Sequence, residues 1–332
     1  MICQFLVLTD THFFAPGGAQ ADKTWWNRVL QSRAADIAED LVKTVREIKP
    51  DFIIHCGDFT GHCDLANFEF GCQVMDAMGC PWFAVPGNHD TWFPGVRAAF
   101  SQRFGLSAPQ CYYALRLAGL KFIFLDVAYW HTVQGEIAPY LDKELYDTGQ
   151  IAGIGPSTEE LDWLEAELAA PVGQPVVLVS HAPLAFRPVY RTGTLPYGKP
   201  APGGEVALVD RMGDIALRGA LRKIIRRSEA VVLALAGHWH IHEALLEEGV
   251  TYCQTASLRE YPFEMRCCAV HPDRIEISTA GLKASEWQRL SYIEEWGNAW
   301  VSGIAHDREF SVPFASQLAK VQASAPMFEN MV

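Results

Sequence analysis

The chain has 332 residues, 49% of them hydrophobic, with a formal net charge of -12 at pH 7. This length and apolar content support a large core without disulfides or structural metals. The negative charge opposes broad electrostatic binding to nucleic acid or anionic lipid, so we expect neither as a partner. A small anionic ligand would need local positive charge, which metal ions can supply.

The nine cysteines are odd in number and scattered, without a CxxC pair. This spacing indicates buried thiols in a reducing compartment, which favours a cytoplasmic protein. Residues 1–8 are apolar but have no basic n-region and no small-residue cleavage site, and they are too few to span a bilayer. We expect them to form the first strand.

The first half of the chain alternates between predicted strands and helices. Aliphatic runs at residues 5–8, 52–54 and 82–85 predict strands. Apolar residues at helical spacing predict helices over residues 37–48 and 65–78. A sheet with helices packed against it follows from this order.

The next predicted elements are a hairpin and a capped helix. The hairpin pairs residues 112–117 with residues 121–127. Ser157 with Glu160 three residues later forms a capping box before the next helix. Residues 183–204 are irregular and rich in proline and glycine, and a loop of that length inside a compact domain is usually a binding loop.

On either side of this loop the sequence predicts a further strand, and after it a second sheet. Residues 176–179 and 231–235 are apolar runs typical of buried strands. Alternation in residues 250–255 and 267–277 predicts antiparallel strands in a second sheet. Before residues 231–235, three arginines at helical spacing indicate a solvated helix face, with a basic stripe for a polyanion as the alternative; they are Arg218, Arg222 and Arg226.

Side chains that can bind metal ions follow five of the predicted strands. A strand that ends in such a loop delivers these side chains to one edge of a sheet, where ligand sites of α/β folds gather. The five segments are Asp10-Thr11-His12, Gly57-Asp58, Gly87-Asn88-His89-Asp90, Ser180-His181 and Gly237-His238-Trp239-His240.

This ligand set suits hydrolysis of a phosphate ester by water activated on two divalent ions, which lie roughly 3.5 to 4 Å apart in such sites. Asp58 is the natural bridging carboxylate, because it is a lone aspartate at a strand end after a glycine. Asp10 and His12 lie two apart on a segment expected to be extended, so both would face one ion, and His238 and His240 repeat that spacing. Oxygen and nitrogen donors without thiolates favour Mn, Fe, Zn or Co.

The five segments together resemble the calcineurin-like metallophosphoesterase superfamily, whose pattern is D-x-H, G-D, G-N-H-[DE], H and G-H-x-H. The match extends over about residues 1–280. The resemblance implies a four-layer α/β/β/α sandwich of two facing mixed β-sheets flanked by helices. It also implies a catalytic domain over residues 1–280. Residues 281–332, rich in tryptophan and phenylalanine, would be an extension that covers this domain or a neighbouring subunit, which would make the protein a homo-oligomer.

The resemblance also assigns roles to individual residues. His89 would contact the phosphate and protonate the leaving oxygen, and Asp90 would position His89. One ion would be held by Asp10, His12, Asp58 and His240, and the other by Asp58, Asn88, His181 and His238.

Two departures from the pattern oppose particular classes of enzyme within this superfamily. Gly61 stands where purple acid phosphatases carry a tyrosine ligand, which opposes a coloured iron–tyrosinate centre. Thr91 and Trp92 follow Asp90, where protein Ser/Thr phosphatases carry an arginine. The remaining pattern is similar to bacterial class III cyclic-nucleotide and glycerophosphodiester phosphodiesterases.

We therefore expect hydrolysis of small phosphodiesters, with a phosphomonoesterase as the alternative. Aromatic residues beside the ligand loops favour a diester, whose second organic group needs apolar walls. The expected substrate contacts are Trp25, Trp92, Arg187, Tyr190 and Tyr261. For Trp25 and Trp92 the alternative is ordinary packing between loop and core.

Two other function classes and a set of histidines receive less weight. The acidic balance opposes a nuclease, and the complete ligand set opposes a non-catalytic scaffold such as the retromer subunit. Six further histidines have no place in the pattern and are expected to be structural; they are His55, His62, His131, His242, His271 and His306.

Overall fold

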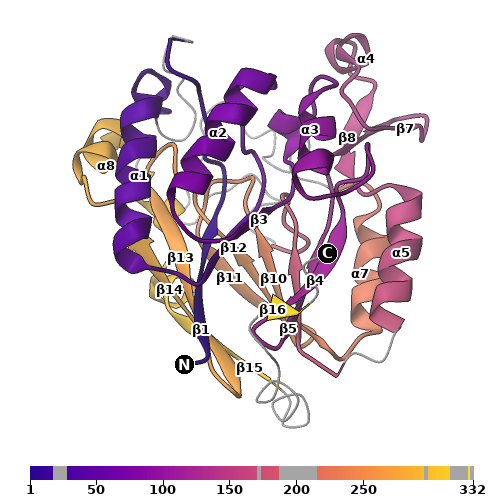
Figure 1. The fold of residues 1–332 in the computed structure, drawn as a ribbon. Coiled ribbons are helices and arrows are strands. Elements are labelled where there is room, and N and C mark those ends of the chain that lie inside the picture. Colours follow the sequence, from indigo (N-terminus) through magenta and orange to yellow (C-terminus); the bar gives the residue numbers. More distant parts are fainter. Residues whose placement is uncertain (18–27, 170–172, 187–214, 295–297, 315–327, 330–332) are drawn as a thin grey trace.

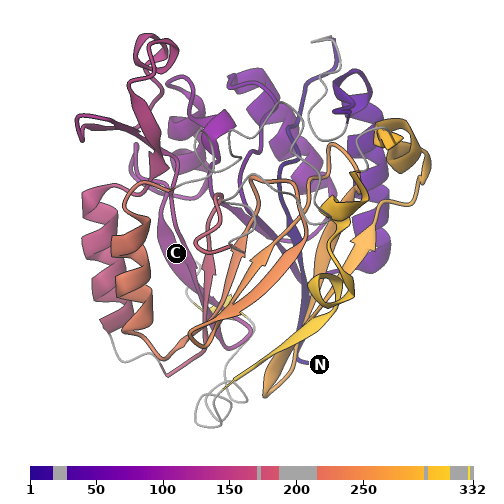
Figure 2. The same ribbon diagram turned by 180° about the vertical axis from the view of Figure 1, so that it is seen from behind.

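The structure is a computed structural model that describes the chain except for residues 18–27, 170–172, 187–214, 295–297, 315–327 and 330–332. Two large mixed sheets face each other and are flanked by helices, as Figures 1 and 2 show from opposite sides. The predicted sandwich is therefore confirmed.

The first sheet has the strand order β15-β14-β13-β1-β2-β3, in which β1, β2 and β3 are parallel and the other three pair antiparallel. The predicted second-sheet position of residues 267–277 is wrong, because β13 pairs with β1 and extends the first sheet. The strands are β1 (Cys3–Leu8), β2 (Phe52–His55), β3 (Trp82–Ala84), β13 (Glu264–Val270), β14 (Arg274–Gly281) and β15 (Phe310–Pro313).

The second sheet has the order β11-β12-β10-β9-β5-β4-β16. The predicted hairpin is present as the antiparallel pair β4 and β5. Strand β12 runs antiparallel to β11 but parallel to β10, so its carboxyl end lies at the same edge as that of β10. The strands are β4 (Tyr113–Leu117), β5 (Leu120–Phe124), β9 (Val176–Val179), β10 (Val231–Ala236), β11 (Glu243–Glu247), β12 (Val250–Gln254) and β16 (Phe328–Glu329).

Aromatic side chains fill the space between the sheets. Phe5 stacks on Phe52 at 5.0 Å between ring centroids, and Phe122 from the second sheet meets Phe5 edge-on at 5.6 Å. All three are fully buried. Burial of this apolar surface is the main term that holds the sheets together.

Helices cover the outer faces of both sheets. Those against the first sheet are α1 (Ala34–Ile48), α2 (Leu65–Ala77) and α3 (Val96–Arg103), and those against the second are α5 (Thr158–Ala169) and α7 (Arg218–Arg226). A small third sheet and the short helix α4 (Lys143–Asp147) project near α3; its strands are β6 (Tyr129–Thr132), β7 (Ile137–Ala138) and β8 (Ile151–Gly155).

The capping box predicted before α5 is half formed. Ser157 Oγ accepts the backbone N–H of Glu160 at 3.1 Å. The Glu160 carboxylate does not return to Ser157 but accepts the backbone N–H of Asp126 at 2.7 Å. Asp126 is paired with the buried Arg97, so Glu160 supports a buried ion pair instead of its own helix.

The arginine face on α7 differs from the predicted solvated stripe. Arg226 is half exposed and pairs with Glu248. Arg218 is buried, with its guanidinium 4.5 Å from the ring centroid of Phe186. The prediction is wrong for Arg218, because the first turn of α7 lies against the segment that follows β9.

The described parts of residues 281–332 pack on the same two sheets. Strand β15 pairs with β14, and Trp287 in α8 (Glu286–Ser291) joins the core beneath α1. The short helices η5 (Asn298–Ser302) and α9 (Ala305–Arg308) lie beside β11, where the backbone N–H of His242 donates to Val301 O at 2.8 Å. This segment thus contacts the chain directly after His240.

All nine cysteines are free thiols, six buried and three half-buried. None of the helices in the described ranges has the length and apolar content needed to cross a membrane.

Candidate metal centre

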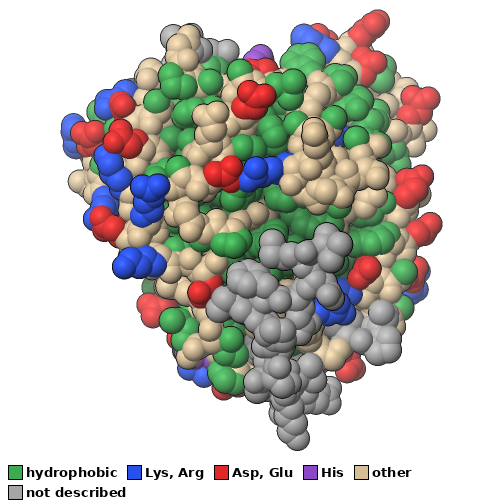
Figure 3. Space-filling model, in the orientation of Figure 1, with side chains coloured by type: hydrophobic (Ala, Val, Ile, Leu, Met, Phe, Trp, Pro, Cys, Tyr) green, Lys and Arg blue, Asp and Glu red, His purple; other side chains and the backbone are tan. Residues whose placement is uncertain are grey.

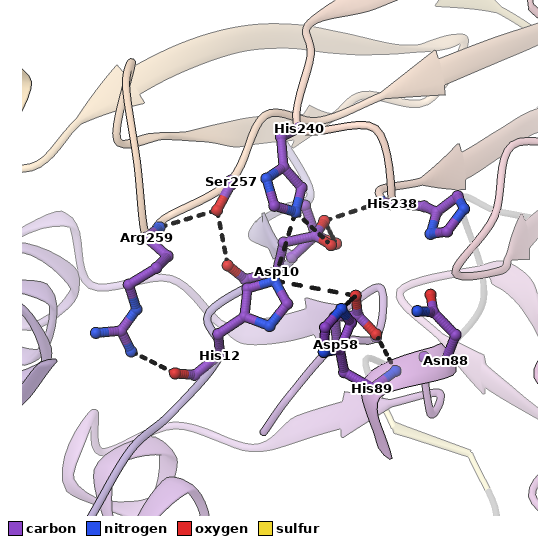
Figure 4. A network of polar contacts seen from close by, with 12 residues as sticks. Asp10, His12, Asp58, Asn88, His89, His238, His240, Ser257 and Arg259 are labelled. Atoms are coloured by element: carbon purple, nitrogen blue, oxygen red, sulfur yellow. Dashed lines mark hydrogen bonds and ion pairs between the residues drawn. The ribbon is translucent and has the colours of Figure 1, made fainter. Parts of the chain in front are cut away.

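The polar segments after the strands meet at one edge of the sandwich (Figure 4). Asp10 and His12 follow β1, Asp58 follows β2 and His181 follows β9. The turn η2 (Asn88–Asp90) follows β3, and the Gly237–His240 segment follows β10. Parallel strands bring their carboxyl ends to the same edge, which explains why segments distant in sequence converge.

The first cluster contains Asp10, His12 and His240, all buried, with one ligand atom from each lying within 4.8 Å of the others. His240 Nε2 is 3.2 Å from Asp10 Oδ1 and 3.4 Å from His12 Nε2. Asp10 Oδ1 is buried and accepts no hydrogen bond from the described residues. A buried carboxylate oxygen with this surrounding suits a bound cation.

The second cluster contains Asp58, His181 and His238. His181 Nε2 lies 3.3 Å from Asp58 Oδ1 and 3.1 Å from His238 Nδ1. The side-chain oxygen of Asn88 is 3.0 Å from the same His181 nitrogen. Two imidazoles, a carboxylate and an amide oxygen therefore face one point, and this donor set suits a divalent transition metal.

Asp58 lies between the two clusters. Its Oδ1 faces His181, and its Oδ2 is 3.9 Å from His12 Nε2. One carboxylate thus presents an oxygen to each cluster, which is what a bridging ligand of a two-ion centre requires.

Two glycines of the motifs allow this close approach. A Cβ atom on Gly87 would lie 2.2 Å from both the backbone nitrogen and Oδ1 of Asp58. One on Gly237 would lie 1.9 Å from Thr9 Oγ1. A side chain at Gly87 would displace the loop after β2 that carries Asp58. A side chain at Gly237 would displace the loop after β1 that carries Asp10, called the Asp10 loop below.

The ligand loops have left-handed backbone conformations. The φ angles are 49° at Asp10, 41° at His12, 72° at His238 and 56° at His240. The expectation of extended segments is therefore wrong. Asp10 and His12 still share a cluster, but His238 and His240 are divided between the two. Such φ values are uncommon for residues other than glycine and gather at functional sites.

Electrostatics keep both carboxylates ionised. Burial alone would raise the pKa of Asp10 and Asp58, but the nearby imidazoles of His240 and His181 hold both pKa values below the usual range. Burial would lower the pKa of these two histidines, yet Asp10 raises that of His240 to about 10 and Asp58 raises that of His181 to about 9. The clusters therefore attract positive charge.

His89 lies beside Asp58, outside the first two clusters. Its backbone N–H donates to Asp58 Oδ1 at 2.9 Å, and its Nε2 is 4.0 Å from Asp58 Oδ2. His89 is also near enough to His12 and Asp58 for the three to share an ion. Counting ions in a variant without this imidazole distinguishes a ligand from a proton donor.

Asp90 is buried and accepts four hydrogen bonds. They come from the backbone N–H groups of Phe59, Thr60 and Gly87 and from Thr60 Oγ1, at 2.7 to 2.9 Å. Asp90 thus ties the Asp58 loop to the turn that carries His89. Asp90 can therefore position the His89 ring through the backbone of the turn that carries His89.

Only two of the expected substrate residues lie within the described part of the chain. The Trp92 ring is 4.7 Å from that of His89, at 30°. Tyr261 places its ring 5.0 Å from that of Tyr292. The other three, Trp25, Arg187 and Tyr190, lie outside the described residues.

The other histidines do not belong to the metal-binding clusters found among the described residues. His55 is fully buried, its Nδ1 accepts the Gly57 N–H at 3.2 Å, and its Nε2 lies 2.9 Å from Thr11 Oγ1. Burial lowers the pKa of His55 to about 3, so it is a neutral structural residue.

Sequence reasoning missed Ser257, Arg259 and Glu260, which follow β12 and contact the first cluster. Figure 4 shows the first two beside Asp10 and His12. Residues 250–255 were expected to be antiparallel, so the polar run after them was not placed at the ligand edge. Since β12 is parallel to β10, the strand-end rule that found the other five segments applies here as well.

Comparison with known proteins agrees with the geometry. The sequence model of the calcineurin-like phosphoesterase family matches residues 3–242 of this chain. Mouse tartrate-resistant acid phosphatase type 5 is 26% identical over 167 residues, which cover 44% of this chain and 48% of that protein. The chain thus spans about half the length of this curated relative.

A crystal structure of a dimetal phosphatase from Danio rerio superposes with a TM-score of 0.60 at 16% identity, over 84% of this chain and 96% of that one. At this identity the likeness shows the fold alone. Because the family model matches more than half of the chain, including the ligand segments, the chain belongs to the calcineurin-like phosphoesterase family.

Proposed function

We propose that this phosphoesterase hydrolyses small phosphodiesters at a centre of two divalent ions. The observation that carries the proposal is the position of Asp58, whose two carboxylate oxygens face two separate clusters of buried ligands. The first ion would be held by Asp10, His12, Asp58 and His240, and the second by Asp58, Asn88, His181 and His238. The ions are Mn, Fe, Zn or Co, in keeping with oxygen and nitrogen donors.

Two such ions lower the pKa of water and neutralise charge on the phosphoryl oxygens. The protein prepares this centre by fixing its ligands. When neutral, His181 donates its Nδ1 proton to Cys56 O at 2.9 Å, which leaves Nε2 to bind a cation. Asp10 and Asp58 stay ionised for the reasons given above.

His89 is the proposed donor of a proton to the leaving oxygen. Its backbone is fixed on Asp58, its ring meets that of His12 edge-on at 4.9 Å, and its side chain is 13% exposed. A partly accessible imidazole beside the ligand clusters can reach a substrate oxygen, and proton transfer of this kind contributes about 10²- to 10⁴-fold.

The surroundings of His89 support the proposed diester preference. A diester carries one negative charge and a second organic group, so it needs an apolar wall more than an additional cation. Trp92 packs on His89, and Phe93 beside it is 46% exposed. The nearby cation Arg259 donates to the backbone oxygens of Thr11 and His12.

The test is a comparison of two substrates on protein reconstituted separately with Mn, Fe, Zn and Co. We expect a higher kcat/KM for bis-(4-nitrophenyl) phosphate than for 4-nitrophenyl phosphate. Asp58→Ala serves as the control for metal-dependent turnover. A preference for the monoester with every ion would assign the protein to the phosphomonoesterases.

Phosphomonoester hydrolysis is the second candidate, because the curated relative is named an acid phosphatase and the Danio rerio structure a phosphatase.

We further propose that the substrate is a small ester and not nucleic acid. On the face in Figure 3, basic side chains over α1 have acidic ones among them, and acidic side chains line the opposite margin. A gel shift at low salt that disappears at high salt would contradict this.

A further inference from the structure

The loop that follows β12 contacts the first cluster from outside the family match, which ends at residue 242. Glu260 is fully buried, and its Oε1 lies 2.8 Å from His240 Nδ1. A neutral imidazole has one N–H. If Nδ1 donates to Glu260, Nε2 is left without a proton and faces Asp10 and His12. Glu260 therefore selects the tautomer and the ring orientation that a metal ligand needs.

Glu260 also adds negative charge next to the first cluster. Its Oε2 is buried and accepts no hydrogen bond from the described residues. Burying a carboxylate beside the ionised Asp10 costs free energy unless positive charge compensates. A divalent ion between Asp10, His12 and His240 supplies this charge.

Arg259 and Ser257 hold the backbone of the Asp10 loop, which carries two other ligands of the first cluster. Arg259 Nη2 donates to Thr11 O at 2.8 Å and to His12 O at 2.5 Å. Ser257 Oγ donates to Asp10 O at 2.8 Å and accepts the Arg259 N–H at 2.9 Å. Three consecutive carbonyls, of Asp10, Thr11 and His12, are thus fixed, and Figure 4 shows the contacts to the first and the last. Asp10 and His12 are also two of the ligands with left-handed φ angles.

We propose that Ser257, Arg259 and Glu260 are positioning residues that set the affinity of the first ion. They act through His240 and the Asp10 loop and do not touch the substrate. This inference rests on the two-ion centre of the proposed function and adds a sixth strand-end segment to it. It predicts that changes in this loop weaken the first ion selectively.

The experiment measures the metal affinity of single sites. His238→Ala removes a ligand of the second cluster, so this variant retains the first site. Asp10→Ala removes a ligand of the first cluster, so the second site is measured alone in that background, relative to Asp10→Ala itself. We expect Glu260→Gln in the His238→Ala background to raise the Kd for Mn or Zn by about 10- to 100-fold, measured by competition with a chelator. In the Asp10→Ala background the same change should move Kd by less than about threefold, a small part of that range.

Glu264→Gln is the matched control. Glu264 also pairs with a histidine, because its Oε2 is 3.2 Å from His242 Nε2, but that pair lies outside the clusters. Glu264→Gln should leave the metal affinities of both sites unchanged. Arg259→Lys keeps the charge but loses the planar fork, and we expect about a tenfold weaker first ion.

The outcomes separate this inference from the proposed function, because metal binding is measured without a substrate. Wild-type affinity at the first site of Glu260→Gln, or equal loss at both sites, overturns the positioning role. Should Glu260→Gln fail to fold by circular dichroism, Glu260→Asp, which withdraws the carboxylate by one methylene, takes its place with the same expected loss. A wild-type protein that binds two ions but hydrolyses no phosphoester would contradict the proposed function alone.

Discussion

The two ligand clusters are supported in different ways. In the first, charged side chains from another loop hold His240 and the carbonyls of the Asp10 loop. In the second, His181 is oriented by the backbone carbonyl of Cys56, and His238 is only half-buried. Burial and charged support are thus concentrated on the first cluster, whereas the second cluster lies nearer to solvent. We therefore expect the first ion to bind more tightly and to exchange more slowly.

The largest effect is expected for the residue that the clusters share. Asp58→Ala should lose both ions and lower kcat/KM by on the order of 10³-fold or more, since each ion contributes several kcal/mol. Elemental analysis and steady-state kinetics measure both. Asp36→Ala on α1, where the side chain is 57% exposed, is the control with wild-type behaviour. Two ions bound at wild-type affinity in Asp58→Ala would refute the bridge.

Removing one ligand from each cluster should have unequal consequences. His238→Ala should lose the second ion, keep the first and reduce kcat/KM by on the order of 10²-fold. Asp10→Ala should lose the first ion and also weaken the second, because Asp10 Oδ2 accepts the backbone N–H of His238 at 3.0 Å. Titration with metal under chelator control gives both constants. Symmetrical losses in the two variants would remove the distinction between the clusters.

His89→Ala tests a residue that is expected to serve neither ion. We predict unchanged metal content and a loss of about 10²-fold or more for diesters with alkyl leaving groups. The loss should be smaller for nitrophenolate, which leaves without a proton. Equal losses on both substrates would reject proton donation, and the loss of an ion would make His89 a ligand.

The smallest expected effect is the release of protons when the metal ions bind, which makes their affinity depend on pH. In the metal-free protein, the raised pKa values of His240, about 10, and His181, about 9, keep both protonated at neutral pH. A histidine must lose its proton to bind a metal, so each ion should release about one proton and bind about tenfold more weakly per pH unit as pH falls. The gain in affinity with rising pH should end earlier at the second site. Calorimetry in buffers of different ionisation enthalpy counts these protons, and heats independent of buffer would contradict the prediction.

The family and the sandwich could be predicted from the sequence alone. Asp10, Asp58, Asn88, His181 and His240 each follow a run of apolar residues, and that local pattern was enough to place them at one edge. Strand and helix positions were also readable, because apolar spacing depends on which face a local segment buries.

The division of the ligands between two ions follows from the family resemblance, but the backbone geometry that produces it and the loop that supports it are visible in the tertiary structure alone. His238 and His240 face different clusters because left-handed φ angles replace the extended backbone that their spacing suggested. The supporting loop at Arg259 and Glu260 depends on β12 being parallel to β10. Strand direction is set by pairing between residues distant in the chain, and alternation of apolar residues is the same in either direction.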